Sequence, residues 1–195
     1  DLMSSPELLL KTIESLKPFT PEARNDFMSI WSEHQVKRKD IITGAGEIEK
    51  YLYFVTDGVQ RIVYEDESDR ESTLVFSYPP SFGGSIDSFF LQKPSPYSFE
   101  ALTPSTFLRA PFQSVEACMQ KHLCVSEAIR TGIMQAFSGL LERMIELQCF
   151  SSEEKFRKLL KRSPHILTLV PHKYLANYLG IDPTNFSKLI NSVRI

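Results

Sequence analysis

The pattern of hydrophobic and polar positions changes three times along the 195 residues of the chain. Residues 5–34 have apolar positions at helical spacing, and in their second half Ala23, Phe27, Ile30 and Trp31 share one face. Each half opens with a serine or threonine followed by proline, a pair that favours the start of a helix. The pattern therefore predicts helices over this whole segment.

Residues 36–110 have a different pattern, made of short runs rich in β-branched and aromatic residues. Glycine, proline, aspartate or serine separates these runs at intervals of about ten residues, which is typical of an antiparallel sandwich or barrel. The acidic stretch Glu65–Ser72 fits the solvated tip of a hairpin. This part of the chain is predicted to be an antiparallel β-domain.

Residues 111–149 return to helical spacing, with a short helix after Pro111 and a long helix over residues 125–150. The apolar stripe of the long helix recurs at steps of three and four residues. Its positions are Val125, Ile129, Ile133, Phe137, Leu140, Met144 and Leu147.

Such a stripe needs a partner along its length, and two partners are possible. The helix either packs on its own β-domain or pairs with the same helix of a second subunit as a coiled coil. Gly132 and Gly139 each weaken an isolated helix by about 1 kcal/mol, a cost that close packing would offset. We favour the second arrangement, a homodimer.

The last 45 residues predict three helices. The segment SSEEKFRKLLKRSP has a serine cap, acidic residues in its first turn, basic residues in its last and a proline that ends it. A helix-turn-helix follows, with a first helix at about Pro171–Leu179. Gly180 stands where the chain must leave that helix with positive φ. Asp182 and Pro183 are the expected N-cap and first residue of the second helix.

The second helix of this motif turns short polar side chains and one lysine outward, which suits base edges and phosphates in a major groove. An ordinary helical hairpin is the alternative. The candidate base-reading residues are Thr184, Asn185, Lys188 and Asn191, and the candidate phosphate contacts are His172, Lys173 and Ser187.

Charge supports a polyanion as the partner of the C-terminal part. The formal net charge of the chain is −2. Residues 1–150 carry 14 Lys and Arg against 21 Asp and Glu, a net charge of −7, whereas residues 151–195 carry 8 against 3, a net charge of +5. A basic segment on an acidic body is typical of nucleic-acid binding, although clustering by chance would also produce it.

The rest of the sequence bears on the cellular location of the protein and on whether it is an enzyme or binds a metal. Apolar runs stay below the roughly 20 residues that span a bilayer, and the three cysteines fit a reducing cytoplasm. Nucleophile elbow, Walker loop, dinucleotide fingerprint and zinc-protease motif are all absent from the sequence, and its four histidines lack metal-ligand spacing. We therefore expect a cytoplasmic protein that is not an enzyme, with no catalytic residues and no metal site.

Over essentially its full length the chain resembles the Crp/Fnr family of bacterial transcription regulators. The residues that carry the resemblance are Gly46-Glu47 followed by YLYFVTDGVQRIVYE with Gly58, then FGG at Phe82–Gly84, and LANYLGIDPTNFSKLI. The segment SSEEKFRKLLKRSP resembles the linking helix of members from Bacteroidetes-type bacteria. The resemblance implies a cyclic-nucleotide-binding β-roll, a homodimer, double-stranded DNA as partner and, often, contact with RNA polymerase.

The sequence departs from this family where cyclic AMP would bind. The family's ribose-binding glutamate corresponds to Gly84, and its phosphate-binding arginine corresponds to Ser95. A buried phosphate without a paired cation loses several kcal/mol, so we expect no cyclic AMP in the usual mode and no other cofactor. Either the site is a structural remnant, or its amides bind an anion, or its side chains bind an uncharged molecule. The candidate residues are Phe82, Gly83, Gly84, Ser85, Ser95, Tyr97, Phe99, Leu140 and Leu141.

The fold expected from these observations is α+β. A jelly-roll-like β-roll with flanking helices is placed at residues 1–124, a dimerisation helix at 125–150 and a helix-turn-helix domain at 151–195. Family members carry a β-hairpin wing next, and here a truncated winged helix is predicted, with the wing absent, disordered or cut away. The expected function is DNA-binding transcription regulation. The alternative is a regulatory protein that binds a cyclic nucleotide or another small ligand and whose C-terminal helices contact protein and not DNA.

Overall fold

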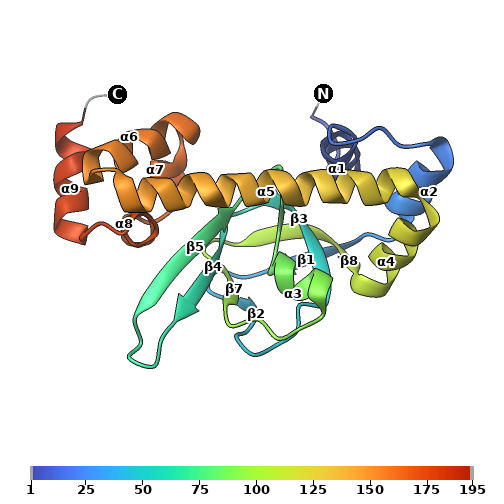
Figure 1. Ribbon diagram of the computed structural model, residues 1–195, viewed down its shortest axis with the longest axis horizontal. Coiled ribbons are helices and arrows are strands. Elements are labelled where there is room, and N and C mark those ends of the chain that lie inside the picture. The colour runs from blue at the N-terminus through green and yellow to red at the C-terminus, as the bar shows by residue number, and fades with distance from the viewer. Residues whose placement is uncertain (1, 194–195) are drawn as a thin grey trace.

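Two four-stranded antiparallel sheets form the β-roll at the centre of the molecule (Figure 1). The computed structural model describes residues 2–193, and Asp1, Arg194 and Ile195 lie outside the described residues. The strand orders are β1-β8-β3-β6 and β2-β7-β4-β5. The strands are β1 (Ser32–Val36), β2 (Ile41–Thr43), β3 (Tyr51–Asp57), β4 (Gln60–Glu65), β5 (Glu71–Ser77), β6 (Ser81–Gly83), β7 (Ser98–Ala101) and β8 (Ser105–Pro111).

Alternation along β3 explains how the roll has two apolar sides. Leu52 and Phe54 pack with the N-terminal helices, whereas Tyr53 and Val55 point into the roll with Phe107. Successive side chains of a strand point to opposite faces, so a strand covered on both faces is apolar at nearly every position. The predicted antiparallel β-domain is confirmed.

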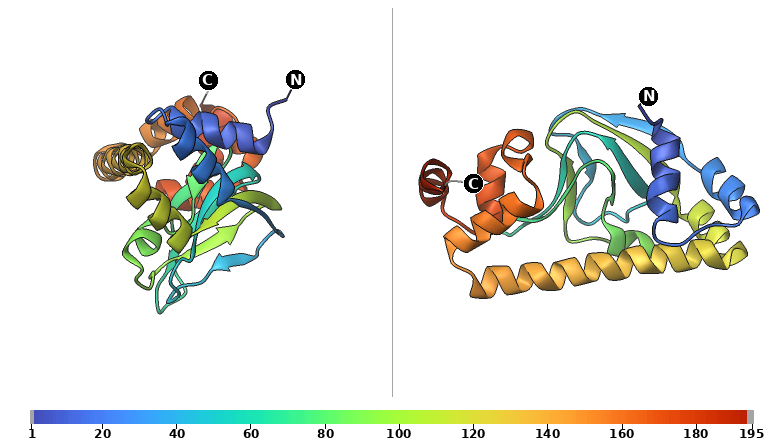
Figure 2. Two further views of the ribbon diagram at one scale, coloured as in Figure 1. Left: turned by 90° about the vertical axis from the view of Figure 1, so that its right-hand side faces the viewer. Right: turned by 90° about the horizontal axis from the view of Figure 1, so that it is seen from above.

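The helices among the described residues lie around and beyond the roll (Figure 2). They are α1 (Ser5–Glu14), α2 (Pro21–Ser29), α3 (Ile86–Leu91), α4 (Phe112–Lys121), α5 (Leu123–Cys149), α6 (Ser152–Arg162), α7 (Ile166–Leu169), α8 (His172–Leu179) and α9 (Pro183–Ser192). The short helices α3 and α7 were not expected from the sequence.

Helices α1, α2 and α4 and the start of α5 share one hydrophobic core with the outer face of the first sheet. The prediction that helix continues to about residue 34 is wrong, because α2 ends at Ser29 and residues 32–36 form β1. The edge strand β1 is held by its pairing with β8, a non-local contact that the local pattern does not indicate. Trp31 lies beyond the helix, yet its ring still packs on Phe27, with centroids 5.4 Å apart.

Helix α5 passes along the roll and carries the C-terminal helices at its far end (Figure 1). Val125 and Ile129 are buried in the N-terminal core, and Ile133 packs partly against it. From Phe137 onward the predicted stripe is exposed. The first part of the stripe therefore packs on its own chain, as the first of the two arrangements expects, and the second part is uncovered in the single chain.

Helices α6 to α9 form a C-terminal module with its own apolar core around Phe156, Leu175 and Phe186. Ser151 caps α6 by accepting a hydrogen bond from the Glu154 N–H. The core of this module extends to the roll through residues that include Val59 and Leu102, so the module is docked on the roll.

Candidate nucleic-acid interface and effector pocket

The turn between α8 and α9 is set by two residues, as the sequence predicts. Gly180 adopts φ +64°, a left-handed conformation that an L side chain rarely takes. The Asp182 carboxylate accepts hydrogen bonds from the backbone N–H groups of Thr184 at 2.9 Å and Asn185 at 3.3 Å. Two otherwise unpaired amides at the start of α9 are thereby satisfied, which fixes where this helix begins.

Helix α9 has one apolar and one polar face. Phe186 and Leu189 are buried, and the Phe186 ring contacts Phe156 edge to face at 5.4 Å between centroids. The opposite face holds the candidate base-reading side chains, all of which are exposed: Thr184, Asn185, Lys188 and Asn191. Nothing in the described chain covers this face, so it is available to a partner.

The three candidate phosphate contacts are placed differently from one another. Ser187 is exposed on α9 beside the base-reading residues. The His172 Nε2 lies 3.2 Å from the Leu167 carbonyl, to which it donates. The Lys173 ammonium lies 4.8 Å from the centre of the Tyr174 ring and lines a hollow of ≈ 280 Å³ at the joint with the roll. His172 and Lys173 thus already have contacts within the chain.

An apolar strip covers the second half of α5. Its side chains keep between 40% and 56% of their surface exposed: Met134, Phe137, Leu140, Leu141, Met144, Ile145 and Leu147. A side chain added at Gly139 would meet no atom within 4 Å, whereas one at Gly132 would lie 3.2 Å from Leu16. The space around Gly139 is open in the single chain. An exposed strip of this kind marks an interaction surface.

The interior of the roll is filled by its own side chains. Tyr53, Phe99 and Phe107 are almost completely buried. The Tyr53 ring lies 5.0 Å from Phe107 and 5.4 Å from Phe99, centroid to centroid. Phe99, one of the candidate pocket residues, is therefore a core residue here.

A carboxylate occupies the space beside Gly84. A side chain at Gly84 would lie 2.8 Å from Glu49 Oε1, and the positive φ of +97° further disfavours any residue but glycine. Glu49 is 1% exposed and its Oε2 accepts a hydrogen bond from the Thr43 hydroxyl. Burial raises the pKa of Glu49 to about 7. Within the described residues, neither Glu49 Oε1 nor the Ser85 hydroxyl has a hydrogen-bond partner.

Ser95 joins two loops of the roll. Its backbone N–H donates to the Glu47 carbonyl at 2.9 Å, and its carbonyl accepts from the Gly46 N–H at 2.7 Å. Its hydroxyl accepts from the Tyr97 N–H at 3.1 Å. Ser95 is 2% exposed, so this position is already saturated with internal contacts.

The other candidate pocket residues are spread over two regions. Phe82 packs against the core that the roll shares with the N-terminal helices, and its ring lies 5.2 Å from that of Phe54, centroid to centroid. Gly83 and Ser85 are buried on either side of Gly84. Leu140 and Leu141 lie in the exposed strip of α5. Among the candidates, Gly84 is the residue whose described contacts place it against Glu49, and Leu140 and Leu141 lie apart from it on α5.

One cluster between α2 and α4 has metal-ligating residue types. The ligand atoms of Glu22, Asp26 and His122 lie within 4.8 Å of one another. The Lys121 ammonium lies 2.9 Å from Asp26 and 3.3 Å from Glu22. Hydrogen bonds from His122 and Lys121 lower the pKa of Asp26. The cluster already holds a cation, and it serves as an ion-paired joint between helices.

Comparisons with known proteins relate the chain to one domain family and to several solved structures. Residues 33–122 match the family described as cyclic nucleotide-binding domain. A comparison with curated protein sequences gives no match. Among solved structures, FixK2 from Bradyrhizobium japonicum superposes with a TM-score of 0.75 at 16% identity, over 83% of each chain.

Two further solved structures have a similar fold. The catabolite activator protein of Thermus thermophilus gives a TM-score of 0.56 at 20% identity, over 91% of this chain and 84% of that one. The c-di-GMP-responsive global regulator CLP of Xanthomonas campestris gives 0.62 at 16% identity, over 88% and 90%. The chain has the fold of the Crp/Fnr regulators. The resemblance inferred from the sequence is confirmed.

The roll differs from the Crp/Fnr family in the segment that corresponds to the family's ligand-binding residues. The resemblance matches Gly84 to the family's glutamate, and in the structure the nearby carboxyl comes from Glu49, on the chain segment before β3. The Glu49 carboxyl supplies no positive charge to an anionic phosphate, and in its ionised form it repels one, most strongly in a low-dielectric interior. Sequence reasoning missed Glu49, because a lone glutamate next to a strand gives no signal of burial.

Each helix of this Crp/Fnr-like chain within residues 2–193 is too short or too polar to span a bilayer.

Proposed function

We propose that the chain is a homodimeric, DNA-binding transcription regulator of the Crp/Fnr type. The observation that carries this proposal is the exposed polar face of α9, held by the Gly180–Asp182 turn on a module rich in basic residues. Docking a helix of this kind into a major groove requires that its outward face be free. The fold shared with known regulators supports the same conclusion.

The proposed dimer is formed by the apolar strip of α5. Phe137, Leu140, Met144 and Leu147 repeat at steps of three and four, the spacing at which two helices pair along a seam. A two-fold dimer of this helix would bring two copies of α9 to one duplex. Two half-sites related by two-fold symmetry are the expected DNA target.

Salt-dependent DNA retention tests the proposed function. Phosphate contacts release counterions, so the logarithm of the binding constant should fall steeply and linearly with the logarithm of salt concentration. We expect the chain to retain duplexes from a random-sequence pool at low salt and to enrich a two-fold-symmetric site. Retention that is absent at low salt would favour the alternative that the C-terminal helices contact protein.

Replacing Lys188 distinguishes base reading from phosphate contact. With Lys188→Ala we expect weaker binding of the enriched site and relaxed preference at one or two base pairs of each half-site, at about 1–3 kcal/mol for each lost contact. Lys161→Ala removes the same charge from the exposed surface of α6 and serves as the control. An equal loss on every sequence would show that Lys188 contacts a phosphate.

The effector domain is proposed not to take cyclic AMP in the usual way. A phosphate at Gly84 would face the Glu49 carboxylate, and Ser95 supplies no positive charge. Relatives of this fold differ in what they sense, since CLP is described as responsive to c-di-GMP. Calorimetry with cyclic AMP should give no heat of binding at micromolar concentrations, and binding in that range would contradict this account.

A further inference from the structure

The C-terminal module is fixed to the roll by a polar clamp, which consists of Asn177 on α8, Arg143 on α5, Arg61 on β4 and the backbone of β5. Strand β5 is an edge strand, so one row of its backbone groups has no partner strand. Such groups are usually covered by other parts of a protein. In this chain two side chains, Asn177 and Arg143, cover them.

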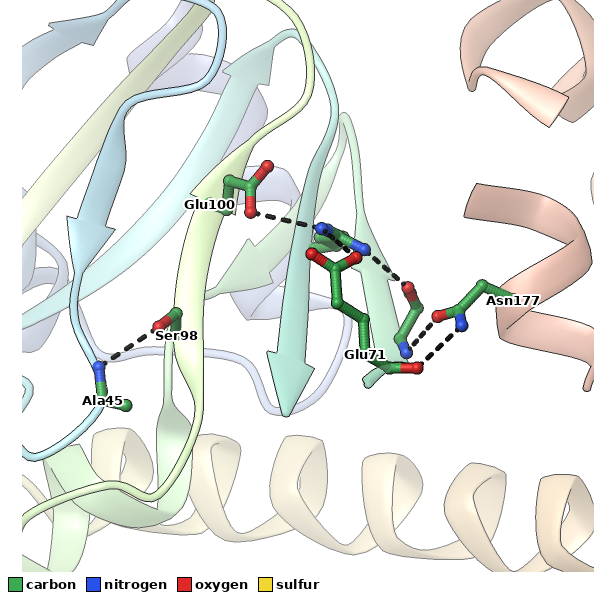
Figure 3. A network of polar contacts seen from close by, with 7 residues as sticks. Ala45, Glu71, Ser98, Glu100 and Asn177 are labelled. Atoms are coloured by element: carbon green, nitrogen blue, oxygen red, sulfur yellow. Dashed lines mark hydrogen bonds and ion pairs between the residues drawn. The ribbon is translucent and has the colours of Figure 1, made fainter. Parts of the chain in front are cut away.

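Asn177 pairs with β5 as a neighbouring strand would. Its side-chain oxygen accepts from the Thr73 N–H at 2.6 Å, and its side-chain nitrogen donates to the Glu71 carbonyl at 2.8 Å (Figure 3). Both hydrogen bonds use one rigid amide group, so they fix direction as well as distance. The amide thus holds α8 in a single orientation against the sheet.

Arg143 connects the dimer helix to both other parts. Its guanidinium donates to the carbonyls of Thr73 at 2.8 Å and Leu74 at 3.1 Å on β5, and to the Tyr178 carbonyl at 2.7 Å on α8. The same group lies over the Tyr178 ring, 3.6 Å from its centre. One side chain therefore bonds to the roll and the DNA-binding module from the helix proposed to form the dimer.

Arg61 completes the clamp from β4, on the face of the sheet that meets α8. It is 2% exposed and pairs with the carboxylates of Glu71 at 3.0 Å and Glu100 at 3.3 Å. Its guanidinium also lies over the Tyr174 ring, 4.4 Å from the centre. One face of α8 is turned toward the roll, because Asn177 and Tyr178 follow Tyr174 by three and four residues.

The clamp leaves the polar face of α9 free. The face of α8 that it uses differs from the one formed by Leu175, Ala176 and Leu179, which packs inside the module. Only Phe150 and Ser151 link α5 to α6 along the chain. Outside the clamp, the module is held by this short link, by apolar contacts with the roll, by the hydrogen bond between Tyr78 and Ser163 and by the ion pairs that Glu146 on α5 makes on α6. The clamp is the group of contacts that joins α8 to both β5 and α5.

We infer that Asn177 and Arg143 are positioning residues that set the distance between the two α9 helices of a dimer and so the spacing of the half-sites it recognises. The inference rests on the proposed DNA-binding function. Half-sites must lie a helical turn of about 34 Å or its multiples apart, so a module fixed to the dimer helix selects one spacing. A module that can move relative to the dimer helix accepts several spacings.

The test compares Asn177→Ala with the unchanged chain in two measurements. In the first, duplexes are selected from a random-sequence pool. We expect one spacing for the unchanged chain, with at least tenfold preference over sites longer or shorter by one base pair, and a preference below about threefold for the variant. The half-site sequence should stay the same. Asn25→Ala, the same change on the exposed surface of α2, should retain the single spacing.

The second measurement needs no DNA. Spin labels at positions 33 and 161, on β1 and α6, report the distance between roll and module. We expect a narrow distance distribution that broadens with Asn177→Ala and stays narrow with Asn25→Ala. Unchanged spacing preference or an unchanged distribution in the Asn177 variant overturns the inference. If the unchanged chain selects no duplex, the proposed function fails, and the distance measurement still decides whether the clamp orders the module.

Discussion

Phe137→Glu should convert the protein from a dimer to a monomer. In the proposed dimer, the substitution removes two buried rings and places two carboxylates in an apolar seam. Together these changes cost at least about 5 kcal/mol, which raises the dimer dissociation constant more than about 1000-fold. Sedimentation analysis over a range of protein concentrations measures the effect directly.

Gln135→Glu provides the matched control for this substitution. Gln135 is exposed on the same helix and, two residues from Phe137, lies about 200° around the helix axis. The new charge should therefore point to solvent and leave the dimer intact. A Phe137→Glu variant that sediments as the unchanged chain does would contradict the assignment of the α5 strip to the dimer.

Glu49→Gln should remove a pH dependence from the stability of the fold. Burial raises the pKa of this carboxyl from its ordinary value of 4.5 to about 7. Between these two values the folded chain binds more protons than the unfolded chain, so the free energy of unfolding falls as pH rises. The contribution is fully present below pH 4.5 and lost as pH rises through 7, amounting to about 3 kcal/mol.

Urea unfolding of both chains at pH 5 and pH 8 measures this difference. Between pH 5 and pH 8, the free energy of unfolding of the unchanged chain should fall by most of this amount of about 3 kcal/mol, relative to that of Glu49→Gln. Glu33→Gln alters an exposed carboxylate on β1 and should behave as the unchanged chain does. Equal pH dependence with and without Glu49 would show that the carboxyl does not titrate in this range and would contradict its raised pKa.

The parts of the fold that were predictable from sequence are those set by neighbouring residues. The turn at Gly180 and the cap at Asp182 follow from local backbone chemistry, and α5 follows from its apolar period. The segment over β1 was predicted as helix because its strand character comes from pairing with β8.

The site residues that sequence reasoning missed depend on contacts between distant parts of the chain. Asn177 meets Thr73 across 104 positions, and Glu49 fills space left by Gly84, 35 positions later. A polar residue on an amphipathic helix or beside a strand is compatible with both exposure and burial. The roles of these residues appear only once the elements are placed together.

Cross-linking to DNA tests most directly the claim that α9 reads a duplex. A photoreactive side chain placed at Ser187 on α9 should cross-link to bases in both half-sites of the selected duplex. The same group at Lys11 on α1, near the other end of α5, should give no cross-link (Figure 1). Bound DNA that cross-links from position 11 and not from position 187 would contradict the account.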